Sequence, residues 1–234
     1  MSEFNIEVAG GASVRLPTAG KYCDRDIVVT ASGVNGEDYL AAICNKEIKE
    51  LISDKVLQIS ASFQNGNATL EKVVLPELTA LAESTFASCS KLSTVWLPKV
   101  TTMGAGNFGS CRALTKIYMP NLVSITGWGY SFNWAALEKA YFPKLTSITA
   151  YDFANCKKLT RFVLGTPSVC TLASVTAFDS TPISGNTYDT NGELGYIYVP
   201  AALVNSYKAA TNWSTYASQI RAIEDYPEVL GGWE

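Results

Sequence analysis

The sequence predicts a leucine-rich-repeat solenoid, in which short parallel strands stack in a right-handed coil, with helical caps at both ends and a small N-terminal β module. Two observations predict it. A segment of about 22 residues recurs along the chain, and each copy places apolar residues at the same few positions. Because one copy cannot bury these side chains alone, consecutive copies must stack.

The copies share the pattern Leu-x-x-Val-x-Leu-Pro-x-Leu-Thr-x-Ile, followed by Phe-x-x-Cys before the next leucine. They begin at Leu70, Leu92, Leu114, Leu137 and Leu159. The third copy is one residue longer, and counting back from the next leucine puts Trp134 where its neighbours have cysteine. We therefore expect repeats over residues 70–182.

Side chains alternate across a strand, so each copy can be divided into inward and outward positions. The inward residues of the first copy are Leu70, Val73, Leu75, Leu78, Leu81 and Phe86. Lys72 and Val74 face outward. The strands end at Pro76, Pro98, Pro120 and Pro143, where a ladder donor is no longer needed.

The ends of the chain depart from the repeat. Residues 36–69 are expected to be a cap and a partial repeat, because the helical spacing of EDYLAAICNKEIKELI places Leu40, Ile43, Ile48, Leu51 and Ile52 on one side. Stacking is expected to begin at Val56, Ile59 and Phe63. Residues 183–226 predict a C-terminal cap with a last strand, Tyr196 to Val199, and one or two short helices, followed by a tail over 227–234.

Residues 1–35 predict a separate unit. The segment VRLPTAGKYCDRDIVVTASG has the pattern of strand, turn and strand, and a glycine-containing linker follows it. Two strands alone are marginally stable, so we expect this unit to serve as an anchor or assembly segment that packs on the solenoid or on another chain.

Composition and charge exclude several functions. The chain has 18 basic and 21 acidic residues and a net charge of −3, so nucleic acid is not expected as a partner. No run of 18 apolar residues occurs, and no membrane insertion is expected. The N-terminal sequence MSEFNIEVAGG has no basic segment followed by an apolar one, so we expect no export signal in it.

Catalytic and metal chemistry are also not expected. The chain has no histidine, and its six cysteines contain no CxxC pair, which argues against common zinc sites and histidine-dependent catalysis. The repeated cysteines Cys89, Cys111 and Cys156 are expected to be buried apolar residues. Glycoside hydrolysis needs carboxylates paired across a cleft, and nothing pairs Glu71, Glu77, Glu83 and Glu138. We expect no enzyme activity and no cofactor.

One outward feature suggests binding. An aromatic strip, defined as Val74, Trp96, Tyr118, Tyr141, Val163 and Tyr198, lies beside a basic row, defined as Lys72, Thr94, Lys116, Lys139 and Arg161. Stacked at about 4.8 Å per strand, five copies extend over roughly 20 Å, enough for several sugar rings or an extended peptide. The alternative is that these residues simply suit strands and stabilise their cross-strand neighbours.

The LPxLTxI cores, the Phe-x-x-Cys element and the closing segment GYIYVPAALVNSYKAATNWSTYASQIRAIED resemble the BspA-like leucine-rich repeat family, over residues 48–226. That family occurs in bacterial surface proteins and in phage and prophage proteins of gut bacteria, and the resemblance implies no shared enzyme activity. Separately, LPTAGKYCDRDIVVTA resembles a segment of phage and prophage tail-associated proteins of Firmicutes.

Together these features predict a non-enzymatic structural protein of a phage or prophage tail, baseplate or fibre. Residues 1–35 would hold it to other virion proteins, and the repeat surface would attach to a host protein or glycan. By analogy with other attachment proteins, a homo-oligomer is expected. The alternative is a BspA-like cell-surface adhesin, and a polysaccharide-degrading enzyme ranks below both.

Overall fold

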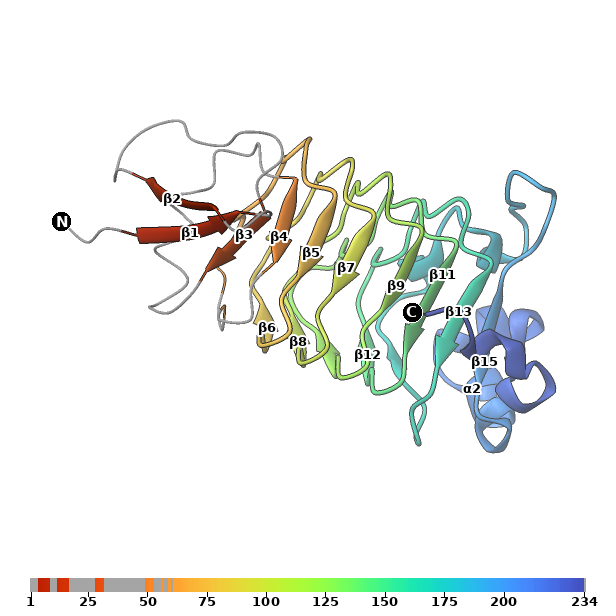
Figure 1. Cartoon of the computed structure of the whole chain (residues 1–234). Helices are drawn as coiled ribbons and strands as arrows, with labels where there is room; N and C mark the ends of the chain where they lie inside the picture. The colour runs from red at the N-terminus through yellow and green to blue at the C-terminus, as the bar shows by residue number, and fades with distance from the viewer. Residues whose placement is uncertain are drawn as a thin grey trace.

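The computed structural model describes the backbone of residues 4–8, 12–16 and 28–31, and residues 49–52, 56, 59 and 61–233 in full. In this part of the chain the backbone winds into a stack of coils (Figure 1). Each repeat contributes one strand to a first face and a shorter strand to a second face. The predicted stacked-repeat architecture is therefore present.

The first face carries the strand that opens each repeat. Its strands are β4 (Glu50–Ile52), β5 (Lys72–Val74), β7 (Thr94–Trp96), β9 (Lys116–Tyr118), β11 (Lys139–Phe142), β13 (Arg161–Leu164), β15 (Tyr196–Val199) and β16 (Ile220–Ala222). Neighbours pair in parallel, from β4 to β7 in one sheet and from β9 to β16 in another. Equivalent residues of successive copies lie opposite one another, as Leu51, Val73 and Val95 do.

The second face is a parallel sheet of two-residue strands. These are β6 (Ala80–Leu81), β8 (Thr102–Met103), β10 (Ser124–Ile125), β12 (Ser147–Ile148) and β14 (Thr171–Leu172). Turns connect the two faces, and between residues 61 and 172 of the described chain no helix occurs. Among the described residues, the first short helix begins at Val175, in the last coil.

The core lies between the two faces. Leu70, Val73 and Leu75 are fully buried, as their inward assignment predicts. One phenylalanine from each coil forms a continuous ladder through Phe86, Phe108, Phe132, Phe153 and Phe178. Successive ring centroids are 5.9, 5.4, 5.1 and 5.5 Å apart and nearly parallel. The ladder ties each coil to the next through stacked aromatic contacts.

The N-terminal strands continue the first face. Strand β1 (Phe4–Val8) pairs antiparallel with β2 (Ala12–Leu16) and β3 (Val28–Ala31), and β3 pairs in parallel with β4. The prediction of a helix that ends at Leu51 and Ile52 is wrong at these two residues, because they belong to β4, which pairs with β5. The earlier part of that helix lies outside the described residues. Val56, Ile59 and Phe63 are buried in the first coil.

Short helices surround the strands at the C-terminal end. They are η1 (Val175–Phe178), η2 (Pro182–Ser184), η3 (Ala201–Leu203), α2 (Val204–Ala209), η4 (Trp213–Gln219), η5 (Ile223–Asp225) and η6 (Pro227–Leu230). The backbone N–H of Cys170 donates to the Tyr207 hydroxyl at 2.9 Å, and Trp213 Nε1 donates to the Cys170 carbonyl at 2.6 Å. These bonds join the cap to the last coil. Among the described residues, no helix has the length and apolar character needed to span a bilayer.

Candidate binding surface

The structure brings the residues of the aromatic strip together on the outer side of the first face. Val74 lies opposite Trp96, and Tyr118 lies opposite Tyr141. The ring centroids of Trp96 and Tyr118 are 6.4 Å apart, and those of Tyr118 and Tyr141 are 5.3 Å apart and stacked. The predicted row of rings is therefore continuous across β7, β9 and β11.

The basic row follows the same register. Lys72 lies opposite Thr94, and Lys139 lies between Lys116 and Arg161. Partial burial, together with the positive charges of Arg161 and Lys116, lowers the pKa of the Lys139 ammonium group. Three neighbouring cations thus create a positive potential along one edge of the strip, which favours an anionic partner.

A contact that the sequence analysis did not anticipate covers part of this strip. The indole ring of Trp233 lies over the strip, with centroids 6.2 Å from Tyr118 and 5.6 Å from Tyr141. Lys139 Nζ lies 5.0 Å from the centroid of the Trp233 ring and donates to the carbonyl oxygen of Gly232 at 2.6 Å. In Figure 1 the C-terminal end of the chain accordingly lies over the first face near β9 and β11.

A second, small apolar core forms beneath this segment. Val163, Tyr198 and Val229 are buried together, with Tyr141 and Trp233 packed against them. Tyr198, which was predicted to belong to the binding surface, is only 9% exposed, so little of its side chain is accessible there. The predicted tail begins with η6, and its residues Val229 and Trp233 pack in this second core.

The accessible part of the strip lies toward its N-terminal end. Trp96 is 40% exposed, while Lys72, Val74, Lys116 and Tyr118 are half-buried. Tyr141 is half-buried, and this burial raises the pKa of its phenol. The nearby Tyr118 raises it further, by a smaller amount. Trp96 is thus the most exposed residue of the strip.

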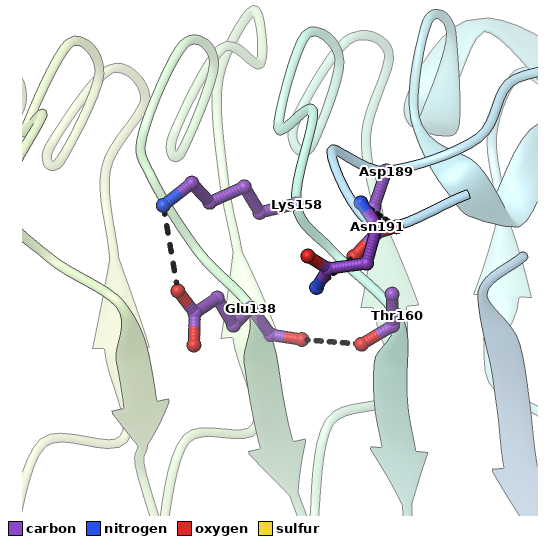
Figure 2. Close-up of polar contacts among 5 residues, drawn as sticks. All are labelled: Glu138, Lys158, Thr160, Asp189 and Asn191. Carbon is purple, nitrogen blue, oxygen red and sulfur yellow. Dashed lines mark hydrogen bonds and ion pairs between the residues drawn. The ribbon is translucent and has the colours of Figure 1, made fainter. Parts of the chain in front are cut away.

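Glu138, one of the carboxylates considered for catalysis, makes local contacts. The Glu138 carboxylate lies 3.6 Å from Lys158 Nζ, and the Glu138 carbonyl accepts from Thr160 Oγ1 at 3.5 Å (Figure 2). The Asp189 carboxylate beside them accepts from the backbone N–H of Asn191 at 2.8 Å (Figure 2). These carboxylates support turns and coil-to-coil contacts.

A pocket of about 380 Å³ opens next to these residues, where β13 and β15 begin. It is lined by Thr160, Arg161, Glu193, Leu194, Tyr196 and Tyr198. The guanidinium of Arg221 lies 4.5 Å from the centroid of the Tyr196 ring, so a cation–aromatic contact adjoins the pocket. The pocket gives the basic row a recess at its C-terminal end.

The cysteines within the repeats are structural. Cys89, Cys111 and Cys156 are buried, and each thiol donates to a carbonyl of the preceding coil at 3.0 to 3.3 Å. Burial raises the pKa of the Cys111 and Cys156 thiols, and raises that of Cys170 to about 12. In the described part of the chain, no cluster of cysteine and acidic side chains is arranged to hold a metal ion.

The placement of Trp134 differs from the prediction. Ala135 donates to the carbonyl of Phe132, as Cys111 donates to Phe108, so Ala135 occupies the buried cysteine position. Trp134 instead occupies the turn position of Ser110, with positive φ, and is 47% exposed. Counting back from the next leucine misplaced it because this copy gains residues before the turn and loses one after it.

The comparisons with known proteins concern the repeats. No match was found among curated proteins. A solved leucine rich cell surface protein from Faecalibacterium prausnitzii A2-165 is 19% identical, with a TM-score of 0.39, over 52% of this chain and 40% of that protein. This chain therefore matches less than half the length of that protein. Residues 128–198 match the family model described as BspA type Leucine rich repeat region (6 copies), so this stretch is similar to BspA-type repeats.

Proposed function

We propose that this chain is a non-catalytic binding protein of a bacterial surface, and that the accessible part of its aromatic strip binds a protein or glycan of another cell. The observation that supports the proposal is Trp96, whose ring is 40% exposed between Val74 and Tyr118 in an ordered row. An ordered, exposed aromatic ring provides contact area at low cost in side-chain entropy.

The neighbouring basic row defines the chemistry of the ligand. Lys72 lies on the strand before β7 and Lys116 on the strand after it along the first face, and both side chains are half-buried. A partner with carboxylates beside apolar faces, such as an acidic glycan or an acidic peptide segment, would use both rows at once.

A cell-surface role is preferred to a role in a virion. The family resembled by the repeats occurs in bacterial surface proteins, which supports an adhesin. The virion hypothesis depends on the resemblance of residues 16–31, of which only 16 and 28–31 are among the described residues, and the comparisons lend it no support.

The proposal competes with the explanation that the strip serves stability alone, since aromatic residues on adjacent strands stabilise each other. Replacing Trp96, Tyr118 and Tyr141 together with alanine separates the two. We expect the fluorescently labelled variant to lose at least tenfold in binding to a panel of epithelial and bacterial cells. The exposed Trp134→Ser variant, outside the strip, should bind normally. Unchanged cell binding by a folded triple variant would overturn the proposal.

A further inference from the structure

The turns that follow the second face carry a row of aromatic rings separate from the strip. Each of these repeats has two turn positions with positive φ. The first of the two is occupied by Ser84 (55°), Gly106 (70°), Tyr130 (65°) and Tyr151 (58°) in successive repeats. Small residues fill this position in the first two repeats, and tyrosines fill it in the next two. The repeat pattern therefore does not account for the tyrosines.

An insertion adds a third ring to this row. Gly127 and Gly129, with φ of 88° and 94°, flank Trp128 in the longer repeat. A Cβ on Gly129 would lie 1.9 Å from the carbonyl oxygen of Ala150, so only glycine fits there. The loop thus has two glycines that hold Trp128 in place over the neighbouring coil.

The indole of Trp128 is fixed in orientation across two coils. Its ring lies beside Gly106, where an added Cβ would be 3.4 Å from Trp128 Cη2. Its Nε1 donates to the Glu83 carboxylate at 2.6 Å. The ring is nevertheless 56% exposed, so its outer face remains available. The indole therefore packs against the turn of the preceding coil at Gly106.

The three rings, Trp128, Tyr130 and Tyr151, form what we call the turn platform. Ring centroids of Trp128 and Tyr130 are 5.5 Å apart, and those of Tyr130 and Tyr151 are 5.0 Å apart with an interplanar angle of 19°. Tyr130 is 38% exposed and Tyr151 half-buried. The row extends over roughly two coil steps, or about 10 Å.

Stability alone does not explain this arrangement. A bulky side chain at positive φ carries a backbone cost that serine or glycine at the equivalent positions reduces or avoids. Tyr130, which is 38% exposed at this position, recovers only part of that cost through burial. Strained backbone that presents exposed rings is a feature of binding sites.

We propose that the turn platform is a second binding site, for a neutral sugar chain. The C–H faces of pyranose rings stack on aromatic rings, and a row of three can contact consecutive sugars. The Glu83 carboxylate lies at the end of the row and disfavours an anionic chain, whereas sugar hydroxyls can donate to it. This proposal is independent of the strip, which lies on the first face.

The indole N–H signals in NMR spectra of 15N-labelled full-length protein test the proposal, because the chain has 5 tryptophans and Trp128 can be assigned by substitution. Cellohexaose, xylohexaose and mannohexaose serve as neutral probes, each titrated to about 10 mM. We expect at least one to shift the Trp128 signal with a dissociation constant on the order of 1 mM. Tyr130→Ser should weaken binding about tenfold when it is followed on the Trp128 signal, and Trp128→Ala should do the same when it is followed on backbone amide signals of the neighbouring turns.

The controls separate this site from the strip. Tyr130→Ser introduces the residue that the fold already carries at Ser84, so it should fold normally. Trp134→Ser, on a nearby turn, and Trp96→Ala, in the strip, should leave the sugar titration unchanged. The proposal is overturned if none of the three sugars shifts Trp128. It is equally overturned if Trp128 responds only to an oligogalacturonate or to an apolar peptide.

Discussion

The indole of Trp233 and the phenol of Tyr141 lie 5.6 Å apart, at an interplanar angle of 45°, so a distant segment covers the middle of the strip. The same segment is held by Lys139, which contacts both the Gly232 carbonyl and the Trp233 ring. A partner that uses Tyr118 and Tyr141 must displace these contacts. The strip is therefore partly occupied by the chain itself.

Replacing Trp233 with alanine should expose Tyr118 and Tyr141. The contacts of Trp233 with the exposed rings and with Lys139 together contribute on the order of 1 kcal/mol, which a partner must overcome to reach the strip. Without them, cell binding through the strip should strengthen about fivefold. The same labelled-protein binding assay measures it, with Tyr226→Ala as the matched control, since Tyr226 contacts Tyr198 away from the exposed rings. Weaker binding would mean that Trp233 belongs to the binding surface.

The buried thiols should resist chemical modification. In a background with Cys23→Ser and Cys44→Ser, the remaining cysteines are Cys89, Cys111, Cys156 and Cys170, all buried. Reaction requires the thiolate, and burial raises the pKa of Cys111, Cys156 and Cys170. We expect an aromatic disulfide reagent at about pH 8 to label none of them rapidly in the native state and all of them in guanidinium. Rapid native labelling would contradict the buried ladder.

The repeat pattern predicted most of the fold. Inward positions such as Val73 and Phe86 follow from alternation and from the requirement that copies stack, and the structure buries them. The helix predicted from periodicity was wrong at Leu51 and Ile52, because their spacing from Ile48 is compatible with a helix as well as with a strand. The neighbouring strand β5 decides between them, and a local pattern carries no information about it.

The candidate site was predicted less completely. The strip followed from register, but the Trp233 contact joins segments far apart in sequence and has no periodic signal. The turn platform was missed because its rings occupy turn positions, not strand positions. The extra length of the third repeat and its Gly-Trp-Gly segment were the available signals.

Asp152 should make stability depend on pH. Its buried carboxylate accepts from the N–H groups of Ser131 at 3.1 Å and Thr149 at 2.7 Å, but burial still raises its pKa. The folded state then holds this proton more tightly than the unfolded state, so stability falls as pH rises from about 4 toward the raised pKa.

Asp152→Asn should remove this part of the pH dependence. The substitution should also lower the free energy of unfolding by about 1–3 kcal/mol at low pH. The reason is that an amide has one acceptor oxygen, whereas the two oxygens of the carboxyl group accept from the N–H groups of Ser131 and Thr149. Urea unfolding from about pH 4 to 8 measures both effects, with Glu77→Gln, which removes a surface ion pair with Lys99, as control. A slope that persists in Asp152→Asn would show that another group is responsible.

Gly129 should be the least replaceable glycine of the turn platform. At its φ of 94°, an alanine Cβ would lie 1.9 Å from the Ala150 carbonyl oxygen, so the backbone must move. Gly192 provides a matched comparison, because its φ is 81° but nothing lies within 4 Å of an added Cβ. Gly192→Ala should lower the free energy of unfolding by about 1–2 kcal/mol, because alanine is strained in the left-handed conformation. Gly129→Ala should cost roughly 3 kcal/mol or more, measured by urea unfolding, and should shift the Trp128 indole signal. Equal losses in the two variants would show that the Gly129 loop has room to relax and does not hold Trp128 rigidly.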